Sequence, residues 1–170
     1  MNTREISPAL AILFAELVDG AHRRDTYMLN VGDEGLLASL DRLSADAASK
    51  SHAGGASIAA HVDHLRYGLS LMNQWQAGAE NPWADADWTG SWRRTKVTEA
   101  EWNRLRAELR QEAHRFLNAL GTPREVNEHQ LNGLISTIPH LAYHLGAIRQ
   151  IDRAARGPTA EEEVASKRAR

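Results

Sequence analysis

Two histidines, His140 and His144, stand four residues apart in a stretch whose apolar residues recur at helical spacing. Residues four apart in a helix lie on one face about one turn from each other, so both imidazoles can reach a single metal ion. A catalytic metal site uses three protein ligands and leaves one position open. The pair therefore needs a third ligand, and without one it is equally well explained as two hydrogen-bonded histidines at the edge of a core.

Two further histidines, His61 and His64, lie in an earlier amphipathic stretch and are candidates for the third ligand. At about 100° per residue, His61 lies about 60° from the centre of the apolar stripe and His64 about 120°. Periodicity alone therefore slightly favours His61. The same calculation places His140 and His144 on the flank of their own stripe, where a ligand at the open inner edge of a helical core would lie.

Four amphipathic helices are predicted to position these histidines. Ser7 and Pro8 are typical of an N-cap and first helical position, Ser57 is a second N-cap, and Thr98 with Glu101 forms a capping box. The predicted long helices cover residues 7 to about 29, 58 to about 77, 99 to 120, and from 125–127 to about 156.

Shorter features complete the predicted chain. Residues 34–43 form a short helical piece, and residues 44–56 are a polar connector. Pro139 lies inside the last helix and could kink it just before His140. No strand-like alternation occurs, so we expect an all-α protein, a four-helix bundle with long crossover connections. We expect one domain over residues 1–158 and a charged, frayed tail over 159–170.

The irregular stretch from Gly78 to Lys96 holds three of the five tryptophans, Trp83, Trp88 and Trp92. A loop of this length in a compact domain is usually functional or a packed crossover, and indole rings seldom remain in water. We expect these rings to cover a core end or a pocket.

Composition limits the classes of function. The formal net charge of −2 gives no reason to expect a nucleic acid or an anionic membrane as partner, and there is no cysteine, which removes disulfides and thiolate ligands. No signal peptide and no membrane span are recognisable, so a cytoplasmic location is the default expectation.

Two short motifs resemble the DinB-like family of metalloenzymes, also called the DinB/YfiT-like superfamily. These are Ser57-Ile58 followed after five residues by His64-Leu65, and His140-Leu-Ala-Tyr143-His144-Leu-Gly146. In that family, a histidine of the second long helix joins an HxxxH pair of the last helix to bind a divalent metal in a four-helix bundle. The resemblance thus implies His64, His140 and His144 as ligands, with His61 as a neighbour. Family members often have Gln after the glycine, where this chain has Ala147.

Three neutral imidazoles leave the metal open to water or substrate, which is typical of a catalytic site. A bound water would make the protein a hydrolase. A bound thiol would make it a transferase, and the resemblance supports this because characterised relatives use low-molecular-weight thiols. The alternative is a non-catalytic, metal-binding or stress-associated bundle. Imidazole ligands suit zinc, nickel, iron or copper, and zinc is preferred on availability.

The remaining expectations concern partners and neighbouring residues. We expect a small-molecule substrate, neither nucleic acid nor membrane as partner, and a homodimer, since family members often dimerise. Tyr67 and Tyr143 flank the proposed ligands and could donate to a bound water, although packing explains them as well. Asp63 points about 100° away from His64 and is not expected to be a ligand. The other histidines, His22, His52, His114 and His129, fit no pattern.

Overall fold

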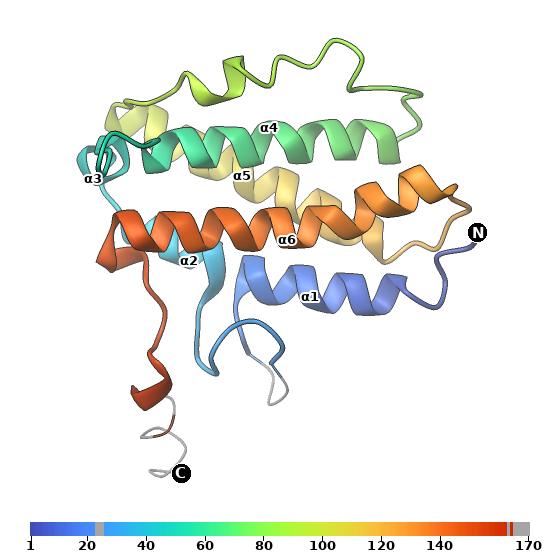
Figure 1. Cartoon of the computed structure of the whole chain (residues 1–170), viewed down its shortest axis with the longest axis horizontal. Coiled ribbons are helices and arrows are strands. Elements are labelled where there is room, and N and C mark those ends of the chain that lie inside the picture. The colour runs from blue at the N-terminus through green and yellow to red at the C-terminus, as the bar shows by residue number, and fades with distance from the viewer. Residues whose placement is uncertain (23–25, 163, 165–170) are drawn as a thin grey trace.

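The computed structural model of the chain describes residues 1–22, 26–162 and 164, and it is all-α (Figure 1). Its four longest helices are α1 (Ser7–Asp19), α4 (Ile58–Gln76), α5 (Glu99–Leu120) and α6 (Glu128–Ile151). Shorter elements are α2 (Gly35–Asp41), α3 (Ala45–Ser49) and the 3-10 turns η1 (Gly90–Trp92) and η2 (Arg153–Ala155). Within these residues there is no β-strand, only the isolated bridges Asn2–Glu125 and Ser51–Ser57. The all-α prediction is confirmed.

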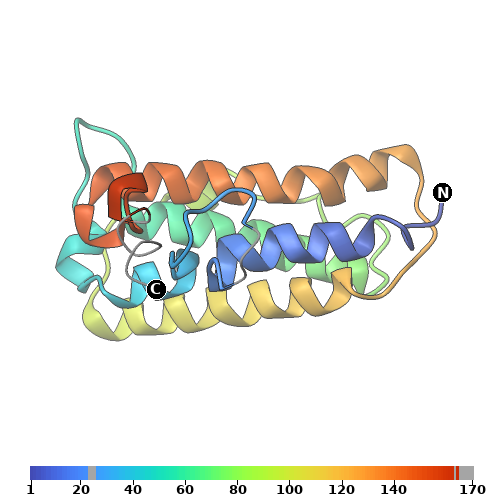
Figure 2. The same cartoon turned by 90° about the horizontal axis from the view of Figure 1, so that it is seen from below.

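The four long helices pack side by side around one hydrophobic core (Figures 1 and 2). Helix α4 contacts α5 and α6, and α1 contacts the same two helices from the other side. The largest side chains in the core are fully buried, namely Phe14, Ile58, Trp102, Phe116 and Ile148. Figure 1 shows the segment after α4 running back along that helix, so that α4 and α5 point in the same direction. This return segment, residues 77–98, covers the candidate site described below.

The predicted N-caps of α4 and α5 are confirmed. The Ser57 hydroxyl accepts from Ala60 N at 3.3 Å, and Thr98 and Glu101 form both bonds of the capping box. Helix α6 begins with a second capping box, between Asn127 and Gln130. It continues through Pro139 without a break, and its N-terminal part turns away from the line of the rest in Figure 1.

The prediction that the first helix reaches Leu29 is wrong, because α1 ends at Asp19. Gly20 adopts a positive φ of 105° that breaks the helix, and Ala21 N donates to Asp33 O at 2.6 Å. The buried Glu16 carboxylate then accepts from the amides of Tyr27, Met28 and Leu29, which holds a loop where the sequence pattern predicted helix.

Three smaller boundaries also differ from the predictions. Ser7 is not the N-cap of α1, because Ile6 takes that position and the Ser7 hydroxyl donates to Thr3 Oγ1 at 3.0 Å. The predicted connector 44–56 contains the short helix α3, capped by Ser44. The last helix ends at Ile151 instead of near Arg156, and η2 follows it.

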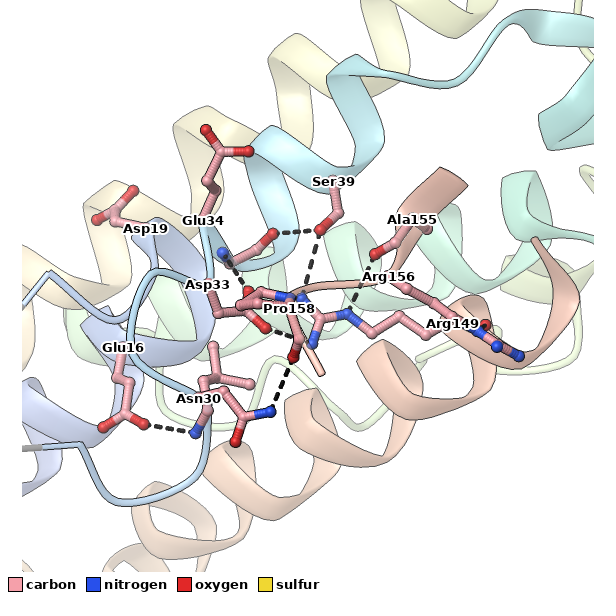
Figure 3. A network of polar contacts seen from close by, with 12 residues as sticks. Glu16, Asp19, Asn30, Asp33, Glu34, Ser39, Arg149, Ala155, Arg156 and Pro158 are labelled. Carbon is pink, nitrogen blue, oxygen red and sulfur yellow. Dashed lines mark hydrogen bonds and ion pairs between the residues drawn. The ribbon is translucent and has the colours of Figure 1, made fainter. Parts of the chain in front are cut away.

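A buried ion pair ties the two halves of the chain together (Figure 3). Arg149 of α6 donates to both carboxylate oxygens of Asp33, at 2.7 and 2.8 Å, and also to the carbonyl oxygen of Ala155. Nearby, the Asn30 side chain donates to Pro158 O at 2.8 Å. The loop before α2 is thereby fixed to the end of α6 and to the segment that follows it.

The predicted charged tail begins with an ordered turn, since Thr159 and Glu162 exchange two hydrogen bonds. The rest of that prediction, residues 163 and 165–170, lies outside the described residues. The division into a domain over 1–158 and a tail stays a prediction. None of the described helices combines the length and apolar character needed to cross a membrane.

Candidate metal centre

Helices α4 and α6 bring three histidine nitrogens together. His140 Nε2 lies 3.2 Å from His64 Nε2 and 3.0 Å from His144 Nε2, and one ligand atom from each ring lies within 4.8 Å of the others. A tetrahedral ion bound at about 2.0–2.1 Å from each nitrogen would separate the nitrogens by about 3.3 Å. The three histidines thus form a buried group that could hold a metal ion with little movement.

The hydrogen bonds of Ser91 fix the tautomer of His64. The Ser91 hydroxyl has one hydrogen and donates it to Trp88 O at 2.6 Å, so it can only accept from His64 Nδ1, at 2.9 Å. His64 therefore carries its proton on Nδ1. Its Nε2 then presents a lone pair to the centre of the group, as a metal ligand must.

His61 lies behind His144 and outside the three-nitrogen group. The Nδ1 atoms of the two rings are 2.8 Å apart, so one of them must donate to the other. If His144 Nε2 binds a metal, His144 Nδ1 carries the proton and donates a hydrogen bond to His61 Nδ1. The structure thus places His61 where it supports a ligand, although periodicity alone slightly favoured it as the ligand itself.

The turn η1 covers the group from the side of α4. The Trp92 ring stacks on the His64 ring with centroids 4.3 Å apart and an interplanar angle of 23°. His144 is 1% exposed and His64 is 8% exposed, whereas His140 is partly open to solvent. Burial and stacking hold two of the rings in fixed orientations, and the remaining approach to the group passes His140.

Burial keeps these imidazoles neutral. Desolvation, followed by the proximity of His140, lowers the pKa of His64 to about 4 and that of His144 to about 3. Desolvation also lowers the pKa of His61 and of His140. Neutral imidazole is the form that binds metals, so the nitrogens are available to an ion at neutral pH without first losing a proton.

A pocket of about 740 Å³ opens beside His140, between α4, α6 and the return segment. Trp83 and Trp88 line it, as predicted for the tryptophans of that segment. The Tyr67 hydroxyl accepts a hydrogen bond from Asp87 N at 2.9 Å and so helps to hold this cover in place. Tyr143 is 68% exposed, with its ring edge-on to His144.

Asp63 is paired with two arginines. Its carboxylate accepts from Arg66 Nε and from Arg94 Nε, each at 2.9 Å, and it therefore does not face the three nitrogens. His114 pairs with Asp19, and His22 contacts the carbonyl of the same residue. Of the histidines that fitted no pattern, His129 lines the far end of the pocket.

Ser91 is the residue of this site that sequence reasoning missed. Its only local signal is its place between Trp88 and Trp92 in the irregular segment. That segment gives no periodicity from which a contact with α4 could be inferred.

The chain matches no protein-family model, no curated protein and no solved structure. The likeness to the DinB-like family therefore remains a resemblance carried by the two histidine motifs. What the structure adds is that the three histidines selected by that resemblance converge, while metal binding by them stays a prediction.

Proposed function

We propose that the protein is a divalent-metal-dependent enzyme of the DinB-like four-helix-bundle type, which acts on a small molecule. The observation that carries the proposal is the convergence of the His64, His140 and His144 Nε2 atoms beside an open pocket. Three neutral ligands leave the ion one or more positions for a reactant, as in catalytic sites.

The charge of the loaded site indicates what would occupy the open position. Three neutral imidazoles leave the two positive charges of the ion uncompensated, and the nearby carboxylate of Asp63 is already paired with two arginines. An anion is therefore favoured as the fourth ligand. Hydroxide derived from water would support a hydrolase, and a thiolate derived from a small thiol would support an S-transferase.

Metal analysis tests the foundation of this proposal. Protein purified without a histidine tag and equilibrated with Zn²⁺, Ni²⁺ or Fe²⁺ should retain about one ion per chain, with zinc as the first expectation. His64→Ala should lose most of this metal, because two imidazoles remain. His52→Ala is the matched control, since His52 is exposed and is not a member of the three-histidine group, and it should bind metal normally. Equal metal content in all three proteins would refute the assigned ligands.

A second measurement separates the two reactions and the non-catalytic alternative. In Co²⁺-loaded protein, a bound thiolate adds a strong near-ultraviolet charge-transfer band that bound water does not. Turnover of an electrophile with a thiol, or of an ester with water, should require both the metal and His140. A protein that binds metal without either turnover would be a metal-binding bundle and not an enzyme.

A further inference from the structure

The pocket beside His140 is long and has the three-histidine group at one end. Both His129, in the first turn of α6, and His140 line it, and they are eleven positions apart in the helix, which is about 17 Å along its axis. Helix α4 forms the opposite wall with Leu65, Leu69 and Met72. A ligand in this pocket would lie along α6 with one end near His140.

The walls of the pocket are uncharged. Among the described residues that line it there is no Asp, Glu, Lys or Arg. The apolar part consists of leucines, a methionine and three indole rings, of Trp75, Trp83 and Trp88. A charged group placed against the leucine, methionine and indole part of the wall would lose its hydration without gaining an ion-pair partner there, which is unfavourable.

The tryptophans give the pocket flat surfaces. The Trp88 ring lies across Gly68, where an added Cβ would be 3.8 Å from its Cζ3 atom. The Trp75 and Trp83 rings are 6.2 Å apart between centroids. Faces and edges of indole pack favourably against other aromatic rings. Polar amides, of Asn81, Gln130 and Asn132, occur toward the end remote from His140.

We infer that this pocket binds an uncharged molecule with a flat aromatic body, oriented with its reacting group at the His140 end. The orientation rests on the proposed function, whereas the preference for an uncharged aromatic body rests on the walls alone. The substrates of the proposed metal enzyme would thus be uncharged aromatic compounds.

Two fluorescent probes that share a ring system test the preference in metal-free protein. N-phenyl-1-naphthylamine is neutral, and 8-anilinonaphthalene-1-sulfonate carries a sulfonate on the same rings. The neutral probe should bind at least ten-fold more tightly, with energy transfer from tryptophan. Equal or tighter binding of the sulfonate, or no binding of the neutral probe, would overturn the inference.

A variant whose new side chain fills the pocket provides a second test of the inference. Gly133 lines the pocket, and a Cβ added there meets nothing within 4 Å, so Gly133→Leu should fold normally and occupy ligand space. Gly146→Leu is the matched control, because Gly146 lies in the same helix, is equally unobstructed and does not line the pocket. Gly133→Leu should weaken the neutral probe at least ten-fold and Gly146→Leu should not. Equal affinities in two folded variants would also overturn the inference.

A third arm separates this inference from the proposed function. In zinc-loaded protein, 2-naphthalenethiol should bind at least ten-fold more tightly than naphthalene, and His140→Ala should remove this difference while naphthalene still binds. Binding of the neutral probe without any retained metal would refute the proposed function and leave the pocket preference standing. Retained metal without neutral-probe binding would refute the pocket preference and leave the proposed function standing.

Discussion

The Ser91 hydroxyl determines which nitrogen of His64 faces the centre of the three-histidine group. It accepts from His64 Nδ1 and donates to a backbone carbonyl, so it cannot reverse its role without losing a bond. The Nδ1 atoms of His61 and His144 form a corresponding contact on the other side. Two of the three proposed ligands are thus held in position by groups that would not touch the metal.

Removal of the Ser91 hydroxyl should therefore weaken metal binding. Ser91→Ala leaves His64 Nδ1 without its acceptor and frees the ring to rotate or change tautomer, and loss of such a support usually costs about 10–100-fold in metal affinity. Competition with a chelator of known affinity measures the change. Thr89→Ala, which removes an exposed hydroxyl from the same segment, should bind as the wild type does. An unchanged affinity in Ser91→Ala would show that stacking on Trp92 is sufficient.

The junction between α1 and α2 depends on two glycines whose backbones touch. Gly20 has a φ of 105°, and a Cβ there would lie 2.7 Å from Glu34 Cα. A Cβ on Gly35 would lie 2.5 Å from Gly20 N. This close approach, together with the Glu16 carboxylate that binds the amides of residues 27–29, ends α1 ten residues before the sequence pattern predicts.

Gly20→Ala should strongly destabilise the protein, because the new methyl group meets backbone that cannot move aside. Gly32→Ala is the matched control, with a φ of 88° and nothing within 4 Å of the added Cβ. The control should lower the free energy of unfolding by about 1–2 kcal/mol, because of the positive φ alone. Gly20→Ala should lower it clearly more or prevent folding. Urea denaturation measures both. Equal losses would mean that α1 and α2 can separate at their junction.

The Asp33–Arg149 pair joins segments far apart in the chain. Both side chains are largely buried, at 3% and 15% exposure, and Arg149 lies in the same helix as His140 and His144. Together with the Asn30–Pro158 contact it closes the end of the molecule where α6 meets the loop before α2 (Figure 3).

Arg149→Met should leave the buried Asp33 carboxylate without its cationic partner, with only the hydrogen bond from Gly35 N remaining. Such a loss destabilises a protein by about 3–5 kcal/mol. Lys50→Met, which removes an exposed ion pair with Asp46, should give no measurable change in the same denaturation experiment. The double variant Asp33→Asn/Arg149→Met should recover part of the lost stability. A loss in Arg149→Met as small as that in Lys50→Met would contradict this role for the pair.

Local signals in the sequence predicted the helices well. Ser57 and Thr98 act as caps through bonds to residues three positions away, so their effect is encoded within one turn. The all-α class and the approximate limits of α4, α5 and α6 follow from such caps and from apolar periodicity. The end of α1 could not be predicted, because Asp33 and the amides of residues 27–29 act on it from beyond the helix.

That His140 and His144 share a helix face follows from their spacing alone, because helical geometry places residues four apart on the same side. The sequence did not determine whether His61 or His64 joins them, and only the resemblance to a known family favoured His64. The packing of α4 against α6 decided that His64 meets His140 while His61 supports His144. Tertiary structure alone brought Ser91 and the tryptophans to the site, since an irregular segment has no period from which its contacts can be inferred.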